Sequence, residues 1–274
     1  MAAAGLVGLE AGIGGDEQHK REATDSLAPK FRPASSLRWV YVSAARAQSY
    51  RFRGGVARVA AWHGRPDVAS LALRGADAPS PRTLRRLLDR LRSDGYREVV
   101  TNALAPGASL PFVDIGFAVR GRLHMLVHDL AELAPPSGRT RKAARRDRDT
   151  ILAVDAAAFD DFWQFDAIAL REATRATPRT HVRVAPPHGE LSGYGLFGRA
   201  ATTGYVQRLA VAAATQGEGY GRALLTDGLH WLRDQGAARA FVNTQEHNDR
   251  ALELYTRAGF SQLPVGLCVL GREL

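Results

Sequence analysis

The chain has 274 residues, of which 45% are hydrophobic, so it is long enough to bury a sizeable core in one large domain or two small ones. Its formal net charge of +9 comes almost wholly from arginine, because the only lysines are Lys20, Lys30 and Lys142. No stripe of basic and aromatic residues accompanies this charge, so we interpret it as a compositional bias and do not expect a nucleic-acid partner.

Cysteine and histidine usage excludes several further classes of protein. The single cysteine, Cys268, excludes an internal disulfide and is typical of a reducing cytoplasm. The eight histidines are scattered without ligand spacing, so no metal is expected. No apolar run approaches the roughly 20 residues of a membrane span, and the first residues lack the positive charge of a secretory signal. We expect a cytoplasmic protein with no membrane partner, and we leave a homodimer open.

The first half of the chain predicts a tail followed by alternating strands and helices. Residues 1–36 are rich in Gly, Ala, Pro and charge and are interpreted as a flexible tail. A helix is predicted to begin at Ser80-Pro81, since proline suits the first turn, where its missing N–H has no partner in any case. The remaining predictions are strands at 39–42, 56–62, 68–73 and 98–101, a short helix ending near 115, and a β segment ending near 130.

The second half predicts a similar order after a hinge-like linker at 134–138. Strands are predicted at 139–143, 181–184, 190–197, 205–211 and 240–243, helices at 149–159, 165–176, 222–235 and 248–258, and a final β segment through 270. The segment from Val99 to Gly116-Phe117 matches the segment from Phe241 to Gly259-Phe260 with one residue's difference in spacing. This match predicts an internal duplication.

A glycine-rich turn joins the predicted strand 205–211 to the helix that follows it. Gly217, Gly219 and Gly221 alternate there, so no Cβ atoms keep a ligand away from the backbone. The free N–H groups of the first helical turn favour an anion. We predict a pyrophosphate cradle, although many strand-to-helix turns contain glycine for packing alone.

Two motifs in register resemble those of the GNAT superfamily of N-acyltransferases. Gln216-x-x-Gly219-x-Gly221, after Leu209-Ala210-Val211, resembles its acyl-CoA-binding motif. Asn248-x-x-Ala251-x-x-x-Tyr255-x-x-x-Gly259-Phe260 resembles its second signature. The glycine spacing differs from the Gly-x-Gly-x-x-Gly of a dinucleotide site. The resemblance implies an α/β (α+β) fold of two GNAT-like domains, each a mixed, mostly antiparallel twisted sheet flanked by helices.

The resemblance also implies acetyl-CoA as co-substrate and a role for each motif residue. Main-chain groups of Leu209, Ala210 and Val211 would pair with pantetheine, one of them polarising the thioester carbonyl. Tyr255 would be the general acid toward the thiolate, or else a tyrosine packed against the Gly259-Phe260 turn. Asn248 would lie near the cofactor, cap its own helix, or do both. The pyrophosphate would be held by the loop residues Gln216, Gly217, Glu218, Gly219, Tyr220, Gly221 and Arg222.

The general base is not determined by the sequence. Many relatives carry a carboxylate on the signature strand, whereas residues 203–208 here contain none. The candidates are Glu190, expected on the preceding strand, Glu246 or His247 after the next strand, and a water held by Gln207 and Tyr205; the amine losing its proton without a base is a further alternative. The region that covers the acceptor in relatives contains Asp160, Asp161, Trp163 and Phe165. These predict an acidic and aromatic amine pocket, or an aspartate pair that is simply solvated.

The first copy lacks these features. Its strand-to-helix junction, residues 74–81, contains two prolines and no Gly-x-Gly, and the position of Tyr255 corresponds to Phe112 or Val113. We therefore expect residues 37–133 to form a degenerate domain without CoA and residues 139–274 to form the catalytic domain. The basic run RTRKAARRDR at 139–148 is interpreted as a solvated edge, or as an aid in binding acidic partners or the CoA phosphates.

Together these features predict an acetyl-CoA-dependent N-acetyltransferase. Its acceptor would be a primary amine of a small molecule or of a peptide or protein N-terminus. The two-copy order also resembles that of the mycothiol synthases. A resemblance to the ribosomal-protein alanine acetyltransferases would instead imply acetylation of a protein N-terminus. The alternative from another class is a non-catalytic CoA-binding protein that regulates a partner or acts as a scaffold.

Overall fold

The structure is a computed structural model that describes residues 2–3, 48–75, 79–186 and 188–274. The strand predicted at 39–42 and nearly all of the tail predicted at 1–36 lie outside these residues. The described strands form a single mixed sheet in the order β2-β3-β4-β5-β13-β6-β11-β10-β9-β8-β7, with β1 beside β10 and β12 beside β6. None of the described helices combines the length and apolar character that crossing a bilayer demands.

Strands β2 to β5 lie at one end of this sheet, β7 to β11 lie at the other, and β13 and β6 lie between them. Their bounds are β1 Ala2–Ala3, β2 Gln48–Phe52, β3 Gly55–Trp62, β4 Arg65–Gly75, β5 Glu98–Thr101, β6 Ala118–His128, β7 Arg141–Lys142, β8 Arg179–Ala185, β9 Gly193–Ala200, β10 Thr203–Val211, β11 Arg239–Gln245, β12 Ser261–Gln262 and β13 Leu267–Glu273. Most neighbouring strands are antiparallel, but β4 with β5 and β10 with β11 are parallel. Both parallel pairs enclose a helix, as expected for a β-α-β connection.

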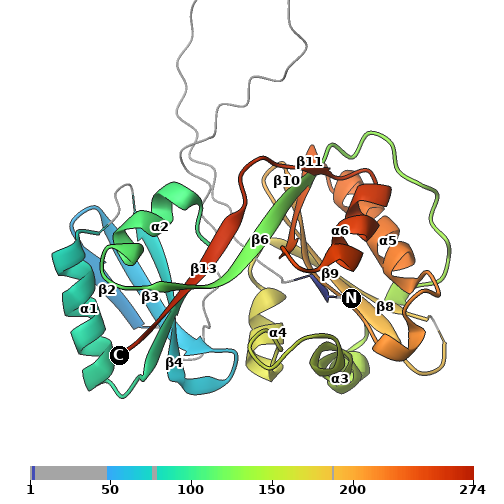
Figure 1. Ribbon diagram of the computed structural model, residues 1–274. Coiled ribbons are helices and arrows are strands. Elements are labelled where there is room, and N and C mark those ends of the chain that lie inside the picture. Colours follow the sequence, from blue (N-terminus) through green and yellow to red (C-terminus); the bar gives the residue numbers. More distant parts are fainter. Residues whose placement is uncertain (1, 4–47, 76–78, 187) are drawn as a thin grey trace, which may run out of the picture.

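The helices cover the faces of this sheet (Figure 1). Their bounds are α1 Pro81–Ser93, α2 Pro106–Val113, α3 Arg148–Ala158, α4 Ala167–Ala173, α5 Tyr220–Asp234 and α6 Asp249–Arg257, with single 3-10 turns at Arg145–Asp147 and Ala213–Thr215. Neighbouring residues of β10 point to opposite faces. Leu209 packs in the cluster under α5 and α6, while Ala210 packs in the cluster under α3 and α4.

Two strands cross between the halves of the molecule (Figure 1). β6 comes from the first half yet pairs with β11, from Ala240 opposite His128 to Gln245 opposite Leu123. β13, at the end of the chain, pairs with β5 of the first half as well as with β6. The expected division at 134–138 therefore separates β6 from its three partners β11, β12 and β13. A mixed α/β sheet flanked by helices is confirmed, and its strands run without a break through both halves.

Three strands of the structure differ from the strands that the apolar pattern predicts. The strand predicted at 190–197 begins only at Gly193, because the Ser192 N–H closes a hairpin on Ala185 O at 2.8 Å. Glu190 therefore lies in the loop before β9, not on a strand. The strand predicted at 139–143 is only Arg141–Lys142. β2 was not predicted, since its sequence QSYRF is polar and its residues are largely exposed.

Candidate functional site

The site begins where two parallel strands separate. β10 pairs with β11 only from Thr203 opposite Arg239 to Tyr205 opposite Phe241, and a bulge follows between Val206 and Arg208. Beyond it, β10 stays paired with β9 on its other side, while its edge toward β11 is no longer paired with β11. The β1 residues pair with the free edge at Leu209 and Ala210 and also lie against β11. The slot between β10 and β11 thus admits an extended backbone beside Leu209 and Ala210.

The loop after β10 exposes the N-terminus of α5. Gly217 and Gly219 have φ of 95° and 86°, which side-chain-bearing residues rarely adopt. Gly219 is the N-cap of α5, and no side chain caps this terminus. The N–H groups of the first turn, together with the positive end of the helix dipole, therefore face outward toward an anion. Gln216 fixes the loop by donating from Nε2 to Val211 O at 3.1 Å.

A cavity of about 500 Å³ lies over this terminus, with a size that suits a cofactor. It brings together eight of the predicted cofactor residues: Val211, Gln216, Gly217, Glu218, Gly219, Tyr220, Gly221 and Arg222. Leu209 and Ala210 lie deeper, on β10, and are fully buried. Asn248 is not in the lining and caps α6 by accepting from Ala251 N at 3.1 Å, so the capping alternative is confirmed.

Four arginines surround the cavity, and three of them were not predicted as site residues. Arg139, from the basic run before β7, donates to Glu218 O at 2.6 Å and lies 4.5 Å over the Tyr220 ring. Arg250 bonds to Gln216 Oε1, and Arg257 is paired with Glu253 at 2.6 Å. The two α6 arginines are seven residues apart and share one helix face, a spacing that would have indicated them. The four arginines outnumber the two lining carboxylates, Glu218 and Glu253, so the cavity favours an anion overall.

Tyr255 lies behind the cavity lining, in the hydrophobic cluster between the sheet and α5 and α6. Its side chain has no exposed surface and packs edge-on against Phe260 at 5.5 Å between ring centroids. Its hydroxyl finds no hydrogen-bond partner among the described residues. Burial raises the pKa of the Tyr255 phenol well above its ordinary value, so the proton stays on the oxygen throughout the physiological range.

The candidate bases lie outside the cavity. Glu190, Glu246 and His247 are exposed, and none of them lines the cavity. Gln207 turns the other way, donating from Nε2 to Thr177 Oγ1 at 3.1 Å across β9. Burial raises the pKa of the Tyr205 phenol, which makes this tyrosine a poor proton acceptor at neutral pH. None of these predicted bases therefore reaches the cavity that lies beside the separation of β10 and β11.

The residues predicted to cover the acceptor divide into two groups. Asp160 and Asp161 are exposed and stabilise their own turn, as the solvated alternative proposed. The prediction that Phe165 lines an amine pocket is wrong. Its ring is buried and packs 4.0 Å from the Arg208 guanidinium. Trp163 is half-buried, and its carbonyl accepts from Arg208 at 2.7 Å.

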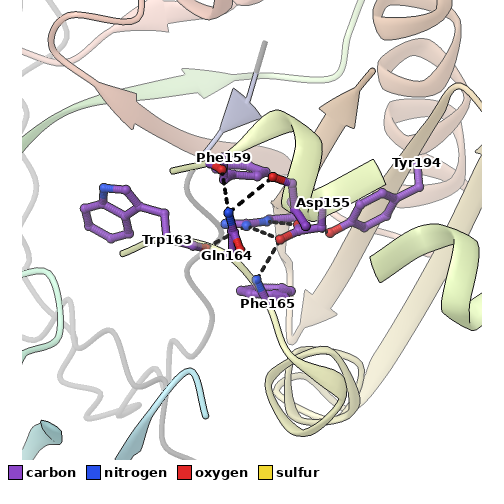
Figure 2. A network of polar contacts seen from close by, with 8 residues as sticks. Asp155, Phe159, Trp163, Gln164, Phe165 and Tyr194 are labelled. Carbon is purple, nitrogen blue, oxygen red and sulfur yellow. Dashed lines mark hydrogen bonds and ion pairs between the residues drawn. The ribbon is translucent and has the colours of Figure 1, made fainter. Parts of the chain in front are cut away.

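A fully buried ion pair holds this loop to β10, and the sequence did not indicate it (Figure 2). Arg208 donates from Nε and from the terminal nitrogen to the two oxygens of Asp155, at 2.7 and 2.8 Å. Tyr194 donates to the same carboxylate at 2.5 Å, and the Phe165 N–H at 2.6 Å. Both carboxylate oxygens of Asp155 are thereby hydrogen-bonded, which burial of the ion pair requires. The network fixes the strand at the bulge and the loop above it.

The described residues contain no grouping of three or more His, Cys, Asp or Glu side chains suited to a metal ion. What the site offers is an open helix terminus, an arginine-lined cavity, a slot between diverging strands and a buried phenol behind them. This arrangement suits an elongated ligand that carries phosphates at one end.

Comparison with known proteins identifies the fold and the family. The profile of the Acetyltransferase (GNAT) family matches residues 148–260. A GCN5-related N-acetyltransferase from Sphaerobacter thermophilus has a TM-score of 0.57 at 17% identity, covering 80% of this chain and 76% of that one. A tandem GNAT protein from the clavulanic acid biosynthesis pathway has a TM-score of 0.57 at 13% identity, covering 80% and 79%.

Sequence relatives extend this likeness beyond the profile match. A protein named mycothiol acetyltransferase from Frankia alni is 32% identical over 183 residues, which are 58% of this chain but only 55% of that relative. One of the same name from Salinispora tropica is 31% identical over 210 residues, 68% of each chain. Given this identity over two thirds of the Salinispora relative, the chain belongs to the acetyltransferase (GNAT) family.

Proposed function

We propose that this protein is an acetyl-CoA-dependent N-acetyltransferase whose cofactor lies across the N-terminus of α5. The observation that carries the proposal is the helix end at Gly219, which has no side-chain cap and faces a cavity lined by four arginines. The N–H groups of a helix end that lacks a side-chain cap are left to water or to a ligand. An uncapped end among arginines is what a pyrophosphate needs.

Acetyl-CoA supplies an acetyl thioester. The chain's own part is to hold the phosphates with the loop amides and arginines, and to align the pantetheine amides with the main chain of Leu209 and Ala210. The pairing of β1 with that edge supports the second role, because it demonstrates room for an extended, hydrogen-bonding chain. Cofactor binding at this edge requires β1 to be displaced.

Tyr255 is proposed as the general acid. Its hydroxyl is buried, has no described partner and keeps its proton at neutral pH, so it is available to protonate a departing thiolate. A purely structural tyrosine would be expected to satisfy its hydroxyl. Removing an unpartnered buried hydroxyl should leave the free energy of unfolding unchanged or slightly raised.

The amine is proposed to enter as the free base, without a dedicated protein base. Support comes from Glu190 and Glu246, which are exposed and outside the cavity. The value of kcat/KM should then rise with pH up to the pKa of the amine itself. Profiles measured with two amines of different pKa should be displaced by that difference. A profile that is the same for both amines would assign the titration to a protein group instead.

The acceptor class is proposed as a primary amine of a small molecule, with a peptide N-terminus as the second choice. The relatives named mycothiol acetyltransferase support the first. The first half, residues 37–133, is proposed as a degenerate copy of the catalytic half, residues 139–274. Its support is a shared local geometry: Phe117 N bonds to Phe112 O at 3.1 Å, as Phe260 N bonds to Tyr255 O at 3.0 Å.

Titration calorimetry with acetyl-CoA and turnover across a panel of amines test the function together. Tyr255→Phe should lower kcat by roughly 100- to 10,000-fold, the usual range for a lost general acid, with unchanged affinity for acetyl-CoA and unchanged stability. Tyr96→Phe, which removes a phenol hydroxyl in the first half, is the matched control. It should change neither kcat nor the affinity for acetyl-CoA. Tight binding without turnover of any amine would instead favour a non-catalytic CoA-binding protein.

A further inference from the structure

A second cavity, of about 620 Å³, opens between β7, β8, α3 and α4. It shares no lining residue with the cavity over α5 and lies against the α3 and α4 side of the sheet. We call it the basic groove and define it by its rim of Lys142, Arg145, Arg148 and Arg171 and its floor of Ile151, Leu170 and Val182. The mechanism proposed above uses none of these residues.

The charge of the groove has one sign. All four charged side chains of its lining are basic and exposed, and none of them forms an ion pair with another described residue. Three of the nearby carboxylates are used elsewhere, and Asp149 of α3 does not line the groove. Asp147 pairs with Arg141 at 2.6 Å, Asp155 pairs with Arg208, and Asp166 caps α4 at Ala169 N. Four unneutralised cations around one hollow favour an anionic occupant.

The floor of the groove is apolar. Ile151 and Leu170 are 4% and 6% exposed, and the half-buried Val182 lies beside them. A phosphate or another small inorganic anion would use the rim but would not cover Val182 or the few exposed atoms of Ile151 and Leu170. An occupant that uses both parts carries negative charges on either side of an aliphatic group.

One wall of the groove is the last strand of the sheet. β7 pairs with β8 only, through Arg141 opposite Val184 and Lys142 opposite Arg183, and no other described strand covers its outer edge. An exposed strand edge accepts an extended peptide through main-chain hydrogen bonds. The edge, the cationic rim and the apolar floor together favour a peptide over a small anion.

We propose that the basic groove binds an extended acidic peptide segment of a partner protein, with one aliphatic side chain seated on Ile151 and Leu170. The basic run 139–148 then serves two sites. Arg139 reaches the cavity over α5, whereas Lys142, Arg145 and Arg148 form the rim of the groove. This role is independent of the acetyltransferase activity.

Fluorescence anisotropy with a labelled peptide of sequence Glu-Glu-Leu-Glu-Glu, acetylated and amidated at its ends, tests the proposal on the full chain. We expect saturable binding at low salt that weakens as salt rises. Replacing the central leucine of the peptide by serine should weaken binding at least fivefold, and a Lys-Lys-Leu-Lys-Lys peptide should not bind. Equal binding of the leucine and serine peptides would overturn the proposal, since the floor would then contribute nothing.

The variant Arg145→Glu/Arg171→Glu should weaken peptide binding at least tenfold. Its control is Arg85→Glu/Arg86→Glu on α1, which reverses two exposed arginines and changes the net charge equally; its affinity should stay within twofold of the wild type. Equal weakening by both variants would assign binding to net charge alone and overturn the groove. Arg171→Glu by itself serves if the double variant fails to fold. A 12-base-pair DNA duplex that binds through these arginines while the peptide does not would also overturn the proposal.

Discussion

The two strand-to-helix junctions after β4 and β10 differ in how the helix end is satisfied. At α1, the N-cap Ser80 accepts from Thr83 N at 3.3 Å, and Pro81 in the first turn removes one of the free N–H groups. At α5, Gly219 provides no side-chain cap and no proline follows. Each helix joins a parallel strand pair. We call the junction before α1 closed, because a side chain caps the helix, and the junction before α5 open, because none does.

The same contrast appears at the next helix. Phe112 and Phe117 pack edge-on at 5.2 Å, as Tyr255 and Phe260 do at 5.5 Å, and both pairs flank a glycine with φ near 90°. Tyr255 carries a hydroxyl, whereas Phe112 at the corresponding position carries none. The comparison teaches that matching positions differ in their polar groups: the first half caps its helix with Ser80 and places Phe112 where the second half has an uncapped Gly219 and the unpartnered hydroxyl of Tyr255.

The largest effect should come from blocking the open junction. Gly219→Glu places a carboxylate at the helix end and a Cβ 3.3 Å from the Arg139 guanidinium, in a backbone conformation that disfavours side chains. We expect at least a roughly 100-fold loss of acetyl-CoA affinity by calorimetry, about 3 kcal/mol. Gly95→Glu after α1 is the control: it has a similar φ of 93° and open space around it. Comparable loss in both would place the cofactor elsewhere.

The contact between the halves should depend on pH. In the turn between β3 and β4, His63 stacks on Phe165 at 5.5 Å, and Trp62 donates to Phe162 O at 2.8 Å. Burial, followed by the charge of Arg208, lowers the pKa of His63 to about 3. Below its ordinary pKa of about 6.5 the unfolded chain binds a proton that the folded chain excludes, so stability falls as the pH falls from 6.5 toward 3.

From this residue we expect a loss of about 1 to 2 kcal/mol in the free energy of unfolding between pH 7 and pH 5. Urea unfolding of His63→Gln should lack that part of the pH dependence. His247→Gln, an exposed histidine in the second half, is the control and should keep it. Identical pH profiles for all three proteins would contradict the assignment.

The closed junction should matter for stability alone. Ser80→Ala removes the cap of α1 and should lower the free energy of unfolding by about 1 kcal/mol. Acetyl-CoA affinity should not change, because the helix belongs to the half without a cradle. Urea unfolding and calorimetry on the same preparation check both statements. A loss of affinity would mean that the two halves do not divide these roles.

The smallest effect concerns the slot between β10 and β11. Replacing Ala2 and Ala3 by proline removes the N–H groups of β1 and should release it from Leu209 and Ala210. Acetyl-CoA should then bind roughly three- to tenfold more tightly, the equivalent of about one hydrogen bond at 1 kcal/mol. Replacement by serine keeps the N–H groups and should change nothing. Unchanged affinity in both variants would mean that the cofactor does not use this edge.

Much of the element order was predictable because helices and strands carry local signals. The α1 start at Ser80-Pro81 and the strand Glu98–Thr101 match their predictions, and the glycine turn before α5 lies where the sequence indicated it. The failures have a shared cause. Glu190 lies outside its predicted strand because the hydrogen bond from Ser192 N to Ala185 O closes the β8–β9 hairpin on the C-terminal side of Glu190. Arg139 entered the site from a run that local pattern could only describe as basic.

The sequence by itself determined that one helix begins at an uncapped glycine and another at a capping serine, since these outcomes depend on residues within a single turn. Only the tertiary structure decided that β6 and β13 cross between the halves, that Arg208 meets Asp155, and that Arg139 and the arginines of α6 face one cavity. Those outcomes depend on which distant segments pack together, and side-chain periodicity indicates that a face is buried without naming its partner.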